Sequence, residues 1–132
     1  MRLRAVDGYV RSSPSDGIRS PRSSWMQRRQ LARWADTRGW RVARVFEDAP
    51  STGPDGPGPR LREALDRVAS GESDGLVVAR LNHLAVSLPV ALDAIERIQA
   101  VGGTFISVSD GIDLGTRTGQ LMLRLLLSVV DW

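Results

Sequence analysis

Four short segments of the chain carry the hydrophobic pattern of β-strands. Residues 3–10 and 40–47 mix apolar and polar positions in partial alternation and contain β-branched residues. Residues 75–79 and 104–109 are short, mainly apolar runs instead, which is typical of strands that are buried on both faces. The pattern therefore predicts four strands, the last two fully buried.

Between these strands the spacing of apolar residues predicts helices over residues 24–38, 60–70 and 88–101. Each helix is bounded by residues that commonly begin or end helices. These are Ser23 or Ser24 and Gly39 for the first helix, Gly71 for the second, and Ser87, Pro89 and Gly102-Gly103 for the third. Residues 11–23 and 49–59 are too rich in Ser, Pro and Gly for regular structure.

Strands that alternate with helices at this spacing form right-handed βαβ units. We therefore expect an α/β fold with three layers, in which helices cover both faces of a mainly parallel sheet of four or five strands ordered 2-1-3-4. Residues 1–118 form this α/β domain, and residues 119–132 begin a further helix of the same domain.

The last segment, residues 119–132, is predicted to be a helix that is apolar around most of its circumference. Its polar positions Gln120, Arg124 and Ser128 form a single stripe at i, i+4 spacing. A helix that packs on one side of a sheet needs only a narrower apolar face. We therefore expect a second copy of this helix to cover the remaining apolar surface. We interpret the segment as the start of a longer, truncated helix.

Composition excludes several classes of function. The chain has no cysteine and one histidine, His83, which excludes disulfides and metal sites built from cysteine or several histidines. It has no apolar run of membrane-spanning length and no apolar leader, so a cytoplasmic location without membrane association is expected. Residues 1–44 carry 11 arginines and three acids, which favours a polyanionic partner such as DNA.

The candidate chemistry lies after the first and third predicted strands. In the expected sheet order these two loops flank the switch point where α/β proteins bind ligands. The first loop holds Arg11, Ser12 and Ser13, and the second is residues 80–86. Hydroxyls, arginines, an amide and an imidazole with few carboxylates suit binding of a phosphodiester, and they fit neither a glycosidase nor a Ser-His-Asp hydrolase.

Several motifs in this order resemble the catalytic domain of the serine site-specific recombinases, the resolvases and DNA invertases. The segment Tyr9-Val10-Arg11-Ser12-Ser13 is similar to their Y-x-R-V-S motif, with Ser12 in place of valine. Further matches are Gln27 with Leu31 and then Gly39-Trp40, Asp48 with Ser51-x-Gly53, and Gly111-Ile112-Asp113 with Thr116-x-Thr118-Gly119. The resemblance covers nearly the whole chain.

The resemblance implies DNA recombination or integration with Ser13 as the nucleophile and Arg11 as a phosphate-binding residue. In this family the serine attacks a DNA phosphodiester and forms a phosphoserine link, without a metal or nucleotide cofactor. Gln27 is then expected to support the site. The resemblance also implies DNA as a partner and a homodimer, or a heterodimer with a related recombinase, through residues 119–132.

The chain departs from the family pattern at its active-site positions. Asn82 replaces an aspartate, and His83 and Val86 replace arginines. Gly58 stands where the R-P-x-L motif has arginine, with Arg60 two residues away and Arg80 as a further candidate for support. Since a transition-state arginine is worth about 10³–10⁵ in rate, we expect strand cleavage to be impaired or absent.

Two alternatives remain open at this point. Besides an impaired recombinase, the chain could be a catalytically inactive module that dimerises or associates with DNA, or a flavodoxin-like domain that binds a phosphorylated small molecule. Binding to DNA with a steep salt dependence favours the recombinase or the inactive module over the flavodoxin-like domain.

Overall fold

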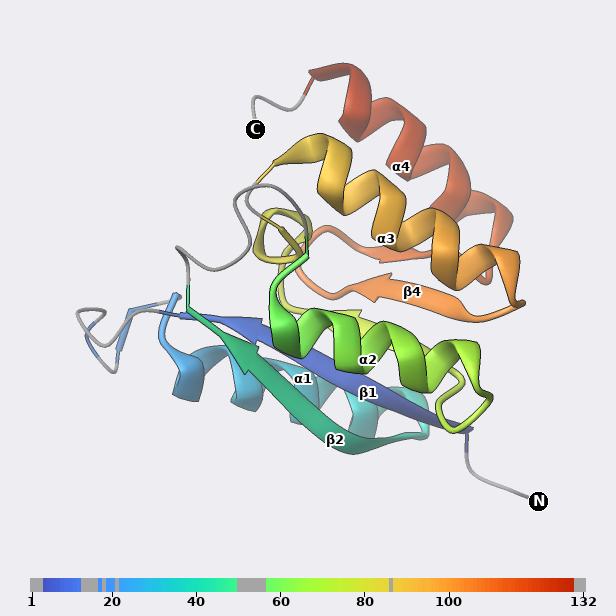
Figure 1. The fold of residues 1–132 in the computed structure, drawn as a ribbon. Coiled ribbons are helices and arrows are strands. Elements are labelled where there is room, and N and C mark those ends of the chain that lie inside the picture. The colour runs from blue at the N-terminus through green and yellow to red at the C-terminus, as the bar shows by residue number, and fades with distance from the viewer. Residues whose placement is uncertain are drawn as a thin grey trace.

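The computed structural model describes residues 4–12, 17, 19–20, 22–49, 57–85 and 87–129. One sheet is formed in this part of the chain, with the strand order β2-β1-β3-β4-β5 (Figure 1). Its strands are β1 Arg4–Arg11, β2 Trp40–Asp48, β3 Gly75–Val78, β4 Thr104–Ser107 and β5 Ile112–Asp113. The first four strands pair in parallel, and β5 adds an antiparallel edge. The predicted mainly parallel sheet with order 2-1-3-4 is confirmed.

Helices cover both faces of this sheet, so the predicted three layers are also confirmed (Figure 1). The helices are α1 Ser24–Arg38, α2 Pro59–Ala69, α3 Leu88–Ala100 and α4 Arg117–Val129, with a short 3-10 helix η1, Leu81–His83, after β3. On one face, Leu31 of α1 packs on apolar residues of β1, β3 and β4. On the other face, a larger cluster joins α2, α3 and α4 to the sheet.

Local hydrogen bonds explain where the elements begin and end. The Ser23 side chain accepts a hydrogen bond from the Met26 backbone N–H, so Ser23 is the N-cap of α1, and Gly39 ends that helix at a φ of 72°. Strands β3 and β4 are shorter than the predicted runs. Their pairing nevertheless continues through hydrogen bonds from the Val108 and Ser109 backbone N–H groups to the Val78 and Ala79 carbonyls.

A buried ion pair fixes α2 against the centre of the sheet. The Asp7 side chain in β1 is fully buried, and its Oδ2 atom lies 2.7 Å from Nε of Arg67 in α2. The hydrogen bond to Asp7 raises the pKa of Arg67, although burial acts against it. A buried carboxylate without this partner would be strongly destabilising.

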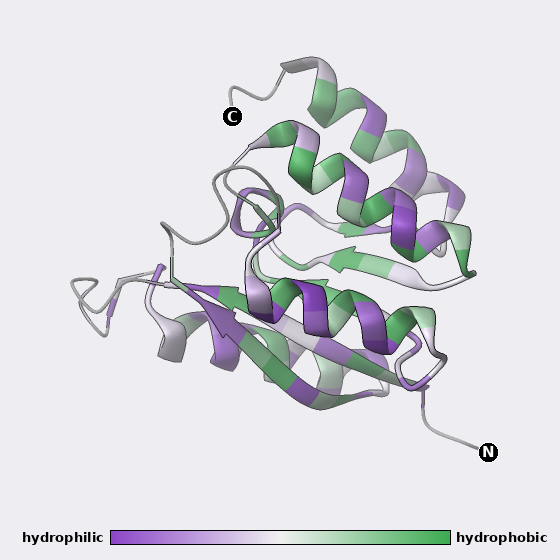
Figure 2. Ribbon diagram, viewed as in Figure 1, coloured by the Kyte–Doolittle hydropathy of each residue, from purple (hydrophilic) through white to green (hydrophobic). Residues whose placement is uncertain are grey.

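Helix α4 packs closely on β5 through Gly119. A Cβ atom at this position would lie 1.9 Å from the Asp113 carbonyl oxygen, so no larger residue fits without moving the helix. Leu123 is buried in the core beside the partly buried Met122, Leu126 and Leu127. Figure 2 shows apolar residues on further parts of α4. None of the described helices is long and apolar enough to span a bilayer.

Candidate active site

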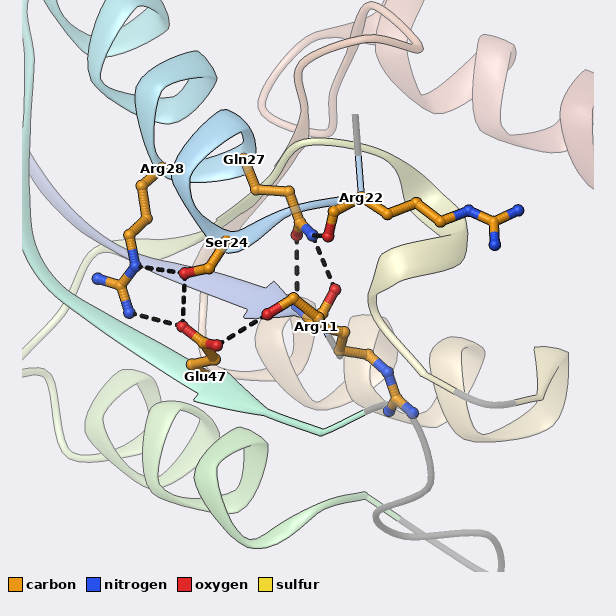
Figure 3. Close-up of polar contacts among 7 residues, drawn as sticks. Arg11, Arg22, Ser24, Gln27, Arg28 and Glu47 are labelled. Carbon is orange, nitrogen blue, oxygen red and sulfur yellow. Dashed lines mark hydrogen bonds and ion pairs between the residues drawn. The ribbon is translucent and has the colours of Figure 1, made fainter. Parts of the chain in front are cut away.

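The carboxyl end of β1 is held in place by the Gln27 side chain, which is fully buried. The Gln27 amide nitrogen donates hydrogen bonds to the carbonyl oxygens of Arg11, at 2.7 Å, and of Arg22, at 2.8 Å (Figure 3). Its amide oxygen accepts a hydrogen bond from the Arg11 backbone N–H at 3.3 Å. One side chain from α1 therefore fixes both the end of β1 and the segment that leads into α1.

The Arg11 side chain lies close to the loop that follows β3. Arg11 is 8% exposed, and its positive charge acts on both the Tyr9 hydroxyl and the His83 imidazole. Figure 3 shows the Arg11 and Arg22 side chains extending away from Glu47, whereas Arg28 turns toward it. The structure thus brings the charge of Arg11 close enough to act on His83, although the two residues are far apart in the sequence.

Ser12 faces a different set of residues from Arg11. Its hydroxyl donates a hydrogen bond to the Glu47 carboxylate at 2.8 Å, and the Ser24 hydroxyl donates another at 2.6 Å. Arg28 pairs with the same carboxylate at 2.9 Å and with the Ser24 hydroxyl (Figure 3). Burial alone would raise the pKa of Glu47, but the hydrogen bonds from Ser24, Arg28 and Ser12 lower it below the usual value.

Glu47 was not among the residues predicted from the sequence. It is preceded by Phe46 and followed by Asp48, both of which face the α2 side of the sheet. Successive side chains of a strand point to opposite faces, so this alternation places Glu47 on the α1 side. The alternation of side chains along β2 could therefore have identified Glu47 as a residue that faces the start of α1.

On the α2 side, the Asp48 carboxylate takes the role of a helix cap. It accepts hydrogen bonds from the Arg60 and Leu61 backbone N–H groups at 3.2 and 3.1 Å, and from the Tyr9 hydroxyl at 2.8 Å. Burial and this last hydrogen bond raise the pKa of Tyr9, which therefore remains a neutral donor. The carboxylate also lies favourably at the positive end of the α2 dipole.

This cap explains the glycine at position 58. Gly58 is the N-cap residue of α2 and provides no side-chain hydrogen bond of its own. A Cβ atom there would lie 2.4 Å from Oδ2 of Asp48, in the space that the carboxylate fills. A larger residue at position 58 would require the Asp48 side chain to shift.

The Arg60 side chain contacts its own helix and β2. Its guanidinium pairs with Glu63 one helical turn later, at 2.9 Å, and lies over the Phe46 ring at 5.5 Å. Its side chain is also half exposed. The structure therefore gives no support to Arg60 as a replacement for an arginine at position 58.

The loop after β3 is fixed by Asp110, which the sequence reasoning also missed. Its carboxylate accepts hydrogen bonds from the Leu81 backbone N–H at 2.8 Å and from the Ser107 hydroxyl at 2.6 Å. Asn82 and Arg80 are exposed, and His83 is partly buried. The Nδ1 atom of His83 is buried and has no hydrogen-bond partner in the described part of the chain.

Burial lowers the pKa of His83, and the neighbouring charges of Arg80, Arg22 and Arg11 lower it further against the opposing effect of Asp110. The imidazole is therefore neutral at pH 7. An uncharged ring thus stands at a position that the family pattern gives to a permanent cation.

Several predicted positions fall outside the described residues. These are the candidate nucleophile Ser13, the loop position Val86 and the motif residues Ser51 and Gly53. No group of three or more His, Asp and Glu residues that suits a metal ion occurs among the described residues. The charged groups that the structure brings together around His83 are Arg11, Arg22, Arg80 and Asp110.

Comparisons with known proteins agree with this architecture. Residues 6–131 match the family model described as "Resolvase, N terminal domain", and no curated protein matches the chain. The N-terminal catalytic domain of TP901-1 integrase is similar, with a TM-score of 0.81, 24% identity, and coverage of 96% of this chain and 93% of that one.

Two further solved structures have the same fold. One is a resolvase family site-specific recombinase from Streptococcus pneumoniae, with a TM-score of 0.70, 21% identity and coverage of 94% and 86%. The other is the C-terminal catalytic domain of ISC1926 TnpA, an IS607-like serine recombinase, with a TM-score of 0.64, 22% identity and coverage of 95% and 79%.

The Glu47 network leads to a prediction about stability and pH. The pKa of Glu47 is lower in the folded than in the unfolded chain, so its stabilising effect is present above the unfolded pKa and is lost as pH falls through the folded pKa. A Glu47→Gln variant should be less stable by about 1 kcal/mol at pH 7. Urea unfolding at a series of pH values should show this difference shrinking toward acid pH.

Glu96→Gln is the matched control, because Glu96 is exposed on α3. Its unfolding free energy should stay within about 0.5 kcal/mol of the unchanged chain. If the difference in unfolding free energy between Glu47→Gln and the unchanged chain grew as the pH fell, the proposed role of the network would be contradicted.

Proposed function

Because this chain belongs to the resolvase N-terminal domain family, a family of DNA recombination domains, we propose that Ser13 is its nucleophile and Arg11 its principal phosphate-binding residue. The observation that carries the proposal is the position of Arg11. Its side chain is buried at the carboxyl end of β1 and acts electrostatically on His83, in the loop after β3. This is the switch point of the sheet, where α/β proteins bind their ligands.

In the proposed reaction, the Ser13 oxygen forms a bond to the phosphorus of a DNA phosphodiester. A deoxyribose oxygen leaves and takes up a proton, which produces a phosphoserine link to one strand end. Attack by a deoxyribose hydroxyl reverses the step and rejoins a strand. One phosphate ester is exchanged for another, so the reaction consumes no nucleotide. Arg11 would stabilise the negative charge that develops on the phosphate oxygens.

We further propose that cleavage by this chain is slow. His83 is neutral at pH 7, and Asn82 and Gly58 carry no charge at positions where the family pattern has charged residues. The Arg60 guanidinium pairs with Glu63. Removing one donor aimed at the developing charge costs about 10²–10³ in rate, so the remaining arginines support a low activity at best.

The exposed face of α4 supports association of the chain with a second subunit. Leu121 and Leu125 are 59% and 61% exposed, and they lie one helical turn apart. The opposite face of the same helix is packed on the core through Leu123. We propose that a homodimer, or a heterodimer with a related recombinase, covers these leucines, and that the dimer acts on DNA in the cytoplasm.

A second candidate function is that of an inactive subunit that dimerises with an active recombinase. The neutral His83 favours it, because this position faces the same site as Arg11 but adds no charge to it. The two candidates differ in whether the chain itself forms a covalent link to DNA.

Trapping of a covalent intermediate tests the nucleophile. The chain incubated with supercoiled DNA should give a low yield of a detergent-stable protein–DNA adduct. Ser13→Ala should abolish it, whereas Ser12→Ala should retain it because the Ser12 hydroxyl is bonded to Glu47. His83→Arg should raise the rate of adduct formation by about 10²-fold. An adduct that survives Ser13→Ala would contradict the proposal, and no adduct even with His83→Arg would favour the inactive subunit.

The proposed interface predicts a loss of association when a charge is placed on the exposed face of α4. Leu125→Glu should convert a dimer to a monomer in sedimentation velocity at unchanged helix content, because the charge would be buried against an apolar partner surface. Val101→Glu is the control, since Val101 is 50% exposed at the end of α3 and not on α4. A Leu125→Glu protein that sediments like the unchanged chain would contradict this interface.

A further inference from the structure

A basic groove lies between α1 and the turn that joins β4 to β5. It has a volume of about 580 Å³, and the α1 side is lined in part by Arg29, Arg33 and Arg38. Arg80, from the loop after β3, lines the same groove, and Val108 and Ser109 lie on its other side. A second hollow of about 330 Å³ shares Trp34, Arg38 and Val108 with it and is also lined by Asp113.

The charges of this groove are not balanced within the protein. No aspartate or glutamate lines the larger hollow. Among the described residues, Arg29, Arg33, Arg38 and Arg80 have no carboxylate partner. By contrast, Arg28, Arg60, Arg67 and Arg97 are each paired with an acid. Four arginines without a carboxylate partner thus line one groove.

The walls of the groove are held at a fixed separation. The Gln30 amide nitrogen in α1 donates a hydrogen bond to the Ser109 hydroxyl across the groove. The Trp34 ring stacks on Trp40 with centroids 5.8 Å apart, and the Arg4 guanidinium lies over the Trp40 ring at 4.2 Å. These ring faces are used within the protein, so the groove is better suited to phosphates than to stacked bases.

The position and length of the groove fit a DNA backbone. Arg80 lines the groove and also acts on His83, so one end lies beside the candidate active site. From Arg29 to Arg38, α1 rises about 13 Å at 1.5 Å per residue. This length matches about four phosphates of one strand at about 3.4 Å axial rise. Guanidinium groups bind phosphates through paired, charge-assisted hydrogen bonds.

We propose that the groove between α1 and the β4–β5 turn binds the sugar–phosphate backbone of duplex DNA beside the cleavage site. The inference rests on the proposed function, because it takes DNA as the substrate. It adds a contact surface on the α1 side of the sheet, opposite α2 and α3 (Figure 1). Its arginines hold the duplex and take no part in bond making.

Two double variants test the proposal with the full chain. Arg33→Gln/Arg38→Gln removes two charges from the groove. Arg62→Gln/Arg97→Gln removes two charges from the exposed surfaces of α2 and α3, on the opposite face of the sheet. Affinity is measured by fluorescence anisotropy of a labelled DNA duplex over a series of salt concentrations, after circular dichroism has shown that both variants are folded.

The groove variant should bind the duplex about tenfold more weakly at low salt, and the control should bind nearly as the unchanged chain does. The slope of log affinity against log salt concentration should fall in magnitude by about 2 for the groove variant alone. Equal losses in both variants would show an effect of net charge only and overturn the proposal. So would unchanged binding by the groove variant, or no binding of DNA by the unchanged chain.

Failure of this inference is distinguishable from failure of the proposed function. A Ser13-dependent adduct together with unchanged binding by the groove variant would overturn the groove and leave the nucleophile in place. Weakened binding by the groove variant without any adduct would leave the groove in place and remove cleavage by Ser13.

Discussion

The parallel pairing of β1 with β3 is the constraint on which the rest of the site depends. It sets Asp7 opposite Leu76 and Gly8 opposite Val77, so the two strands end at the same edge of the sheet. Arg11 and the loop that contains His83 therefore become neighbours. Gly8 allows α1 to pack closely on the middle of β1, because a Cβ atom at this position would lie 2.8 Å from the Leu31 side chain of α1.

Two carboxylates then fix the end of β2 on opposite faces of the sheet. Glu47 binds the start of α1 together with Ser12, and Asp48 binds the start of α2 together with Tyr9. Both helices are thereby tied to the segment that carries Arg11. Gly58, the N-cap residue of α2, leaves open the space that the Asp48 carboxylate fills.

Much of the fold follows from the sequence, because long periodic segments determine it. The boundaries of α1 at Ser24 and Arg38 agree with the expected helix, since Ser23 and Gly39 provide local capping. Elements without such a pattern were missed. β5 is two residues long and η1 three, so neither has a hydrophobic period of its own. Both depend on tertiary hydrogen bonds, such as that from Leu81 to Asp110.

The candidate site was less predictable than the fold for a physical reason. Spacing along the chain places Arg11 and His83 at strand ends, but it does not give the protonation state of His83. That state depends on burial and on Arg80 and Arg22, which only the folded chain brings close. In the same way, the pairing of Arg60 with Glu63 follows from side-chain geometry on α2 and not from the motif in which Arg60 occurs.

His83 is the only histidine of the chain, so its ring protons report on the site without ambiguity. The most direct measurement is therefore an NMR titration of the His83 Cε1 proton, with and without a short DNA duplex. The account predicts a pKa below the usual value for the free protein, and a higher pKa with DNA because a phosphate brings negative charge beside Arg11 and His83. A His83 pKa that DNA leaves unchanged, at concentrations where the duplex is bound, would contradict a phosphate site between these residues.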